Sequence, residues 1–228
     1  NGKPAEHGEM RPQDEGCGLD LARAQSQPVH AGPGSLNLGF LAYPHGPGDV
    51  RTATVTYTND TATAVTLALD LRMSGKDGGA APDRMFAVDQ PSVTVPANGT
   101  AAVTVTADPA AGPPGAYGGY LTATAGDYVL HTTVGGYVEP EMYDLTVSGI
   151  ARDGRAAAVR SKAALWSLTT GEYLERHFAP GSPTVTFRVP PGTYNLAGTL
   201  STADAANQTV TELAMVIDPQ LRIRGNRG

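Results

Sequence analysis

The sequence predicts an all-β protein made of two consecutive antiparallel Greek-key β-sandwiches, preceded by a mostly irregular N-terminal arm. Apolar and polar residues alternate with a period of two over residues 50–73, the pattern of a sheet with one buried and one wet face. The 228 residues include 28 glycines and 18 prolines, which suits many short strands joined by many turns. We therefore divide the chain into an arm (1–32), a first sandwich (33–138) and a second sandwich (139–228).

Residues 50–73 are expected to form two strands folded about an Asn59-Asp60 turn. In the first strand Val55 and Tyr57 share a face with other apolar residues, and threonines occupy the opposite face. In the second strand aliphatic residues at every other position from Val65 to Met73 share a face. Each strand should therefore bury one side and leave the other in water.

Shorter alternating segments surround this pair and complete a helix-free set of about seven strands, the pattern of a sandwich. Asn98 and Gly99 stand between two of these segments. We predict that they form a tight structural turn, because Asn and Gly accept the positive φ angles that such turns require. The other predicted strands of the first sandwich are 36–40, 85–88, 93–95, 101–107, 117–125 and 128–134.

The second sandwich is predicted from strands at 143–147, 163–168, 185–189, 194–196 and 210–217. Trp166, the only tryptophan, is interpreted as a core residue. In the arm, residues 19–24 could make one or two turns of helix. A helix that short is unstable alone, so it would need a partner surface.

Composition narrows the classes of partner. The net charge of −6 argues against nucleic acid and against an anionic membrane surface. No window approaches the ~20 apolar residues of a membrane span.

Cys17 is the only cysteine and cannot form an intrachain disulfide; we interpret it as a small residue beside glycines. The first residues show neither an initiator methionine nor a signal peptide, so we expect a processed form or a piece of a longer protein.

Residue patterns that would indicate catalysis are weak. The five histidines lack the spacing of a metal site, and we predict no metal and no cofactor. No serine occupies a Gly-x-Ser-x-Gly elbow. Glu139 and Glu141 share a face of an extended segment, as the paired carboxylates of a glycosidase would, but at the predicted domain junction we favour linker solvation. No catalytic residue is predicted.

Four tyrosines gather along one predicted hairpin. Aromatic rings exposed on a sandwich face can bind sugars or peptides by stacking, which makes Tyr117 and Tyr120 candidate binding residues. The alternative is core packing that includes a tyrosine corner, in which the hydroxyl bonds to the backbone. The sequence favours the core interpretation without excluding the other. The cluster comprises Tyr117, Tyr120, Tyr128 and Tyr137.

Three segments, taken in order, resemble the post-catalytic C-terminal region of actinomycete (Streptomyces-like) secreted subtilisin-like serine peptidases of the S8 family. Residues 14–39, with Gly16-Cys17-Gly18 and an Ala-Arg-Ala step, are similar to the segment that closes the peptidase domain, although Cys17 stands where the family usually has alanine. Residues 54–71 and 92–108, the latter containing VPANGTAAVTV, resemble its fibronectin-III-like domain. Residues 143–158 and 185–196, the latter containing VPPGTYNL, resemble its prealbumin-like (carboxypeptidase-regulatory-like) domain.

The resemblance implies a non-catalytic accessory region of a secreted, extracellular peptidase. The family's Asp-Thr-Gly, His-Gly-Thr and Gly-Thr-Ser-Met-Ala phrases do not occur here, so no catalytic residue carries over. The expected role is to brace or space the catalytic domain and to contact protein substrate or a cell-surface glycan. The alternatives are a stand-alone secreted adhesion or carbohydrate-binding module, and a subunit or inhibitor of a separate protease chain.

Overall fold

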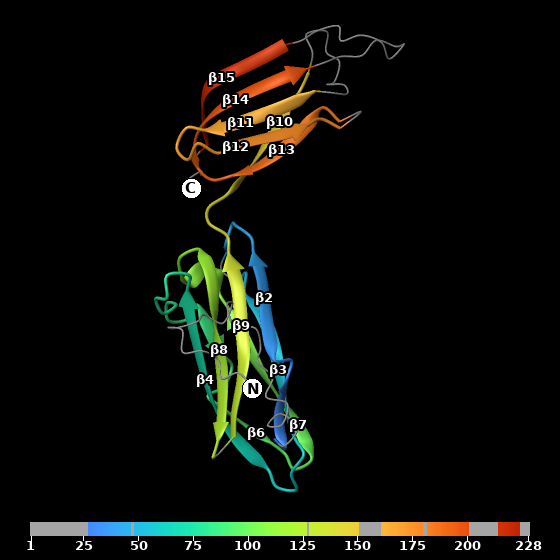
Figure 1. Cartoon of the computed structure of the whole chain (residues 1–228), viewed down its shortest axis with the longest axis vertical. Coiled ribbons are helices and arrows are strands. Elements are labelled where there is room, and N and C mark those ends of the chain that lie inside the picture. The colour runs from blue at the N-terminus through green and yellow to red at the C-terminus, as the bar shows by residue number, and fades with distance from the viewer. Residues whose placement is uncertain are drawn as a thin grey trace, which may run out of the picture. The chain divides into compact units, whose positions relative to one another are not determined.

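A computed structural model describes residues 27–46, 48–126, 128–150, 161–179 and 182–200, together with the backbone of 214–223 (Figure 1). The chain divides into two units, Asn1–Pro140 and Glu141–Gly228, each of which is described by itself. The boundary lies two residues beyond the one predicted from the sequence. The predictions for residues 1–26, including Cys17 and the short helix, lie outside the described residues.

The described part of the first unit is a sandwich of two sheets (Figure 1). Its elements are β1(Val29–Gly32), β2(Ser35–Leu41), β3(Arg51–Asn59), β4(Val65–Gly75), β5(Phe86–Val88), β6(Ser92–Val95), β7(Gly99–Ala107), the 3-10 turn η1(Pro109–Ala111), β8(Gly115–Ala125) and β9(Tyr128–Val138). One sheet has the strand order β1-β3-β7-β5 and the other β2-β9-β8-β4-β6. All neighbouring strands are antiparallel except β2 and β9, which run parallel.

Alternation along the strands builds the core as predicted. Val55 and Tyr57 on β3 are fully buried, while the threonines at the alternate positions, Thr54, Thr56 and Thr58, face outward. Val103 and Val105 on the paired strand β7 are also fully buried and belong to the same apolar cluster. Each fully buried side chain of this kind stabilises the fold by ~1.5–3 kcal/mol. The predicted inward faces of β3 and β7 are therefore confirmed.

The predicted hairpin between β3 and β4 is wrong. β3 pairs with β1 and β7, whereas β4 pairs with β6 and β8, so the two strands lie in different sheets. The chain crosses from one sheet to the other between Asn59 and Val65. The turn-forming residues were recognised correctly, but they form a corner between sheets.

A buried asparagine holds this corner. The Asn59 side chain is fully buried, and its amide nitrogen donates to the carbonyl oxygens of Thr63 (2.8 Å), Val95 (3.2 Å) and Pro96 (3.0 Å). Its amide oxygen accepts from the backbone N–H and the hydroxyl of Thr61 at 2.9 and 2.7 Å. The corner is therefore tied to the connection between β6 and β7, and its buried polar atoms are satisfied.

The described part of the second unit contains β10(Tyr143–Ser148), β11(Lys162–Ser167), β12(Tyr173–His177), β13(Thr184–Val189), β14(Gly192–Leu200) and β15(Ala214–Ile223). One sheet pairs β10 with β13, and the other has the order β12-β11-β14-β15. The strand predicted at 210–217 overlaps β15 over residues 214–217, and residues 210–213 lie outside the described residues. β12 was not predicted. The buried cluster of this unit is Ala163, Leu165, Phe178, Val185, Phe187, Val189 and Tyr194.

The phrase Pro-Pro-Gly-x-Tyr occurs once in each unit, at 113–117 and 190–194, and makes the same corner both times. The Tyr117 hydroxyl donates to the carbonyl oxygen of Pro113 at 2.7 Å. The Tyr194 hydroxyl donates to the carbonyl oxygen of Pro190 at 2.8 Å. Both rings are buried. These are tyrosine corners, in which one side chain fills the core and ties the strand entry to the preceding loop.

The Tyr117→Phe variant should unfold at lower urea concentration and lose about 1 kcal/mol, because it removes one hydrogen bond and leaves the Pro113 carbonyl without it. Tyr57→Phe is the matched control. The Tyr57 hydroxyl is buried, has no hydrogen-bond partner among the described residues, and its pKa is raised by burial to about 12. Removing it should leave stability unchanged or raise it. Equal losses in the two variants would contradict a stabilising corner.

Gly119 lies on β8 where the neighbouring strand passes close. An added Cβ would lie 1.9 Å from the Arg72 carbonyl oxygen of β4, so the strands would have to separate. We expect Gly119→Ala to cost about 3 kcal/mol or more in chemical unfolding. Gly34→Ala, where nothing lies within 4 Å of the added atom, should change stability by less than about 1 kcal/mol. A tolerated Gly119→Ala would show that this strand register is wrong.

Candidate functional site

The outer surface of the sheet containing β11 and β12 carries a chemically varied group of described side chains. Alternate residues of β11 face outward because Ala163 and Leu165 fill the core. In the register of the two strands, Lys162 lies opposite His177, Ala164 opposite Glu175, and Trp166 opposite Tyr173. We call this surface the aromatic–polar face; it comprises Lys162, Ala164, Trp166, Tyr173, Glu175 and His177.

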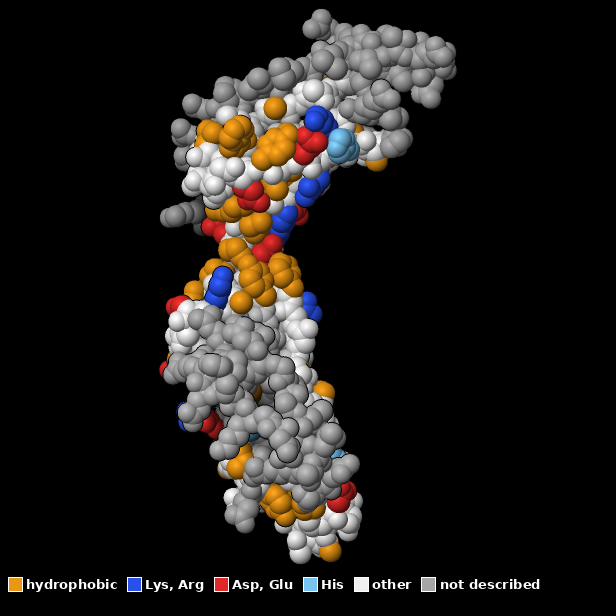
Figure 2. All heavy atoms as spheres, viewed as in Figure 1, with side chains coloured by type: hydrophobic (Ala, Val, Ile, Leu, Met, Phe, Trp, Pro, Cys, Tyr) orange, Lys and Arg blue, Asp and Glu red, His pale blue; other side chains and the backbone are white. Residues whose placement is uncertain are grey.

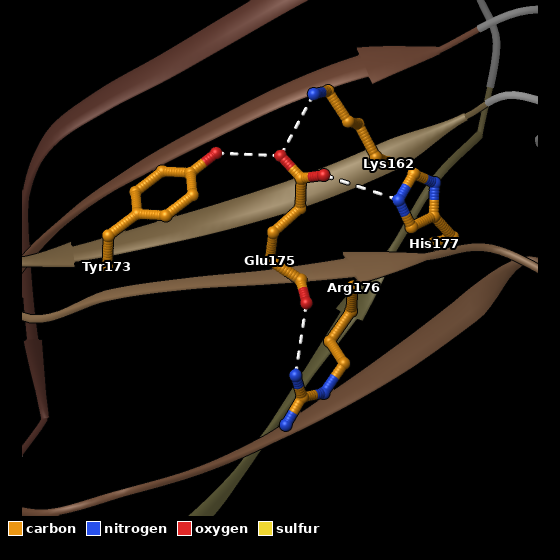
Figure 3. A network of polar contacts seen from close by, with 5 residues as sticks. All are labelled: Lys162, Tyr173, Glu175, Arg176 and His177. Carbon is orange, nitrogen blue, oxygen red and sulfur yellow. Dashed lines mark hydrogen bonds and ion pairs between the residues drawn. The ribbon is translucent and has the colours of Figure 1, made fainter.

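Glu175 is the centre of a polar network on this face (Figure 3). One carboxylate oxygen accepts from the Lys162 ammonium at 2.9 Å and from the Tyr173 hydroxyl at 2.7 Å. The other carboxylate oxygen lies 3.2 Å from Nε2 of His177. Arg176 points away from this carboxylate: its guanidinium donates to the Glu175 carbonyl oxygen at 3.0 Å and lies over the Phe187 ring.

The network shifts the protonation of its members. Hydrogen bonds from Lys162 and then from Tyr173 lower the pKa of Glu175 below its ordinary value. The hydrogen bond to Glu175 raises the pKa of Lys162 and that of Tyr173. At neutral pH the carboxylate and the ammonium are therefore both charged and paired. Because both side chains remain partly exposed to solvent, the pair contributes little to folding stability, and its main effect is to fix these side chains in one arrangement.

Two large aromatic rings stand beside the network. Trp166 is 55 % exposed and Tyr173 is 57 % exposed. Figure 2 shows hydrophobic side chains of this unit gathered next to acidic, basic and histidine side chains. The interpretation of Trp166 as a core residue is therefore wrong: Leu165 is fully buried, and the period of two places its neighbour outside.

The next strand, β14, extends this surface. Asn195 lies opposite Trp166 and Ala197 lies opposite Ala164 in the register of β11 and β14. Ala164 and Ala197 thus lie side by side and form a floor of small side chains. Trp166 and Asn195 bound this floor at one end, and Lys162 lies at the other. Glu175 lies beside Ala164 on β12.

The candidate tyrosines do not form one surface. Tyr117 is 7 % exposed and its ring fills the core of the first unit, and Tyr128 packs partly buried against the same core. Tyr120 lies on the outer face, half-buried, edge-on to His131 with ring centroids 6.1 Å apart. Tyr137 is exposed and stacks on Phe40 with centroids 5.5 Å apart.

A shallow hollow of about 430 Å³ between β2, β8 and β9 is lined by Asn37, Gly118, Thr133 and Gly135, among others.

The other sequence-predicted residues are placed as follows. Asn98 has a positive φ of 48°, and Gly99 opens β7 and donates its N–H to the Pro96 carbonyl oxygen at 3.2 Å. Glu139 is buried and accepts from the backbone N–H of Tyr43 at 2.7 Å, so its predicted role in linker solvation is wrong. Glu141 accepts a hydrogen bond from the Tyr143 hydroxyl.

Among the described residues, no group of three or more His, Cys, Asp or Glu could hold a metal ion. Within the same residues, no helix is long and apolar enough to cross a membrane.

No protein-family model and no curated protein matches the sequence. Among solved structures, the chain is similar to a family 123 glycoside hydrolase from Clostridium perfringens, at 11 % identity over 49 % of this chain with a TM-score of 0.39, and it spans only 27 % of that hydrolase. An ASH/PapD-like domain of human CEP192 matches at 16 % identity over 50 % of this chain and 86 % of that one, with a TM-score of 0.39.

The class 5 fimbriae chaperone CfaA matches at 10 % identity over 83 % of this chain and 98 % of that one, with a TM-score of 0.36. The PapD-like and chaperone neighbours are Ig-like β-sandwich folds. At such identities and TM-scores they carry no argument about function.

Lys162→Met and Tyr173→Phe should each raise the pKa of Glu175 toward its ordinary value, with the larger effect for Lys162→Met. The measurement is a pH titration of the side-chain carboxyl ¹³C signal by NMR. Because the folded-state pKa of Glu175 lies below its unfolded-state value, any stability from the network is present above that unfolded value. It is lost as the pH falls through the folded-state pKa. An unchanged Glu175 pKa in both variants would contradict the network.

Proposed function

We propose that this chain is a non-catalytic accessory region of a secreted subtilisin-like serine peptidase of the actinomycete type. In this role its two sandwiches brace the catalytic domain or space it from its surroundings, and they contact extended protein substrate. The catalytic peptidase domain is then the principal partner, either in the same parent chain or as a processed partner.

The observation that carries the proposal is the order of the resembling segments combined with their placement in the fold. The VPANGTAAVTV phrase spans β6 and β7 in the first unit, and the VPPGTYNL phrase spans β13 and β14 in the second. Each phrase thus lies in a unit with its own apolar cluster. Two self-contained sandwiches in series suit a role of spacing and presentation, because each can keep its shape without the other's core.

Two of the candidate nucleophilic serines, Ser167 and Ser182, are engaged in local structure. Ser167 is buried, and its hydroxyl oxygen accepts from the backbone N–H of Thr170 at 3.1 Å. Ser182 donates to the Thr184 carbonyl oxygen at 3.3 Å. Ser35 and Ser92 lie exposed on strands. These placements favour hydrolysis being carried out elsewhere in the parent protein.

We expect the purified chain to show no casein hydrolysis that a serine-directed inhibitor suppresses. Inhibitor-sensitive turnover by homogeneous protein would overturn the non-catalytic role.

The coding sequence upstream should continue into a peptidase domain with the Asp-Thr-Gly, His-Gly-Thr and Gly-Thr-Ser-Met-Ala phrases in that order. A signal peptide directly before residue 1 would instead support a stand-alone module.

In the parent peptidase, removal of residues 139–228 should lower kcat/KM for casein several-fold and leave kcat/KM for a short chromogenic peptide unchanged. Contacts far from the scissile bond act only on substrates long enough to reach them. Equal loss on both substrates would indicate that the deletion damages the catalytic domain. No loss on either would contradict substrate contact by the second sandwich.

A further inference from the structure

We propose that the aromatic–polar face, together with Asn195 and Ala197 of β14, is a binding site for neutral saccharides. A hexopyranose ring would stack on Trp166 and Tyr173 and extend over the small floor of Ala164 and Ala197 toward Lys162. The proposal concerns the second unit alone and does not depend on the link to a peptidase.

The aromatic half of the site fits one face of a sugar ring. A pyranose presents C–H groups on its broad faces and hydroxyls around its rim. Trp166 and Tyr173 lie directly opposite each other on adjacent strands, and more than half of each side chain is exposed to water. Covering these rings with a C–H face removes apolar surface from water on both sides of the contact.

The middle of the site consists of two small side chains. Ala164 and Ala197 are opposite each other in the strand register, and neither has a side chain beyond Cβ. Trp166 and Lys162 lie four residues apart on β11, which corresponds to roughly 13 Å along an extended strand. The small side chains are therefore flanked by an aromatic ring at one end and an ammonium at the other, with Glu175 along one side. Because Ala164 is only 9 % exposed, the sugar would contact mainly these flanking groups.

The polar half of the site fits the hydroxyl rim. An ammonium has three N–H donors, and the Lys162 ammonium gives one to Glu175 at 2.9 Å. A carboxylate has about four acceptor positions, and the Asn195 amide adds both donors and an acceptor next to Trp166. Sugar hydroxyls both donate and accept, so they can replace the water bound to these groups. The network holds Lys162 and Glu175 in place beforehand, which lowers the entropy cost of binding.

The charge balance selects a neutral ligand. The Glu175 carboxylate is matched by the Lys162 ammonium, with His177 also 3.2 Å away, so the face has no excess of negative charge for a cationic ligand. The whole chain carries a net charge of −6, which disfavours an acidic polymer. An apolar protein surface would bury the Lys162–Glu175 pair without new hydrogen bonds, at a desolvation cost. A hydroxylated, uncharged ligand avoids all three penalties.

The test uses the purified full chain and a panel of neutral oligosaccharides: cellohexaose, xylohexaose, maltohexaose and chitohexaose. Since Trp166 is the only tryptophan, stacking on it should shift the intrinsic fluorescence of the protein on titration with at least one member of the panel. Isothermal titration calorimetry with the same sugars then gives the affinity. No response to any member by either method would overturn the proposal.

Variants locate the site. Trp166→Ala should weaken binding by about thirtyfold or more, and Lys162→Met or Glu175→Gln by about tenfold. Phe40→Ala, which removes an exposed aromatic ring from the first sandwich, is the matched control and should bind like the unaltered chain. Because Trp166 is exposed, Trp166→Ala should keep its circular dichroism spectrum and unfolding midpoint. Binding that survives Trp166→Ala, or that is lost in Phe40→Ala, would overturn the assignment.

Two further outcomes would also overturn it. Tighter binding to an acidic polysaccharide such as polygalacturonate, abolished by salt and by Lys162→Met, would indicate an anion site. Binding of unfolded casein through Trp166 with no response to sugars would indicate a protein-docking surface. Neither the casein hydrolysis assay nor the upstream coding sequence bears on these results, so this site and the peptidase proposal can fail separately.

Discussion

The constraint on which both units depend is that a strand can bury only every other side chain. Leu165, Phe187 and Val189 occupy one side of their strands and are fully buried, so the residues between them face outward. In the first unit the outward positions of β3 are mainly threonines, which fit a solvent-exposed sheet face and do not by themselves indicate a binding site. On β11 and β12 the outward positions hold two aromatic rings and three ionisable groups. Packing does not require those residue types there, which is why this face is the candidate site.

The same period explains which parts of the fold could be predicted. Over the nine residues of β3, apolar and threonine residues alternate without ambiguity, so the buried positions of Val55 and Tyr57 followed from the sequence. β11 is six residues long and contains Leu165 and Trp166 side by side, both apolar, so the sequence does not decide which faces inward. The corner at Asn59 was mistaken for a hairpin because its deciding contacts are made to Val95 and Pro96, far along the chain.

The candidate site was missed for a related reason. Tyr117 and Tyr120 are close in sequence but three residues apart on one strand, which places them on opposite faces of the sheet. The group around Glu175, by contrast, is assembled by register, since Lys162 on β11 reaches a carboxylate thirteen residues away on β12. The alternation of Tyr173, Glu175 and His177 was the available signal. It could not show which strand lay beside them.

In the second unit, the residues that stabilise the fold and those of the candidate binding site are different, but they lie next to each other on β14. Tyr194 turns inward, is buried, and is tied by its hydroxyl to the Pro190 carbonyl, so it fixes where β14 begins. The next residue, Asn195, must then face outward, and the register places it opposite Trp166. The corner thus sets the position of one wall of the candidate site without taking part in it. A partly exposed ion pair adds little to stability, so under the saccharide proposal the order of the Lys162–Glu175 network serves mainly to hold polar groups ready for a ligand.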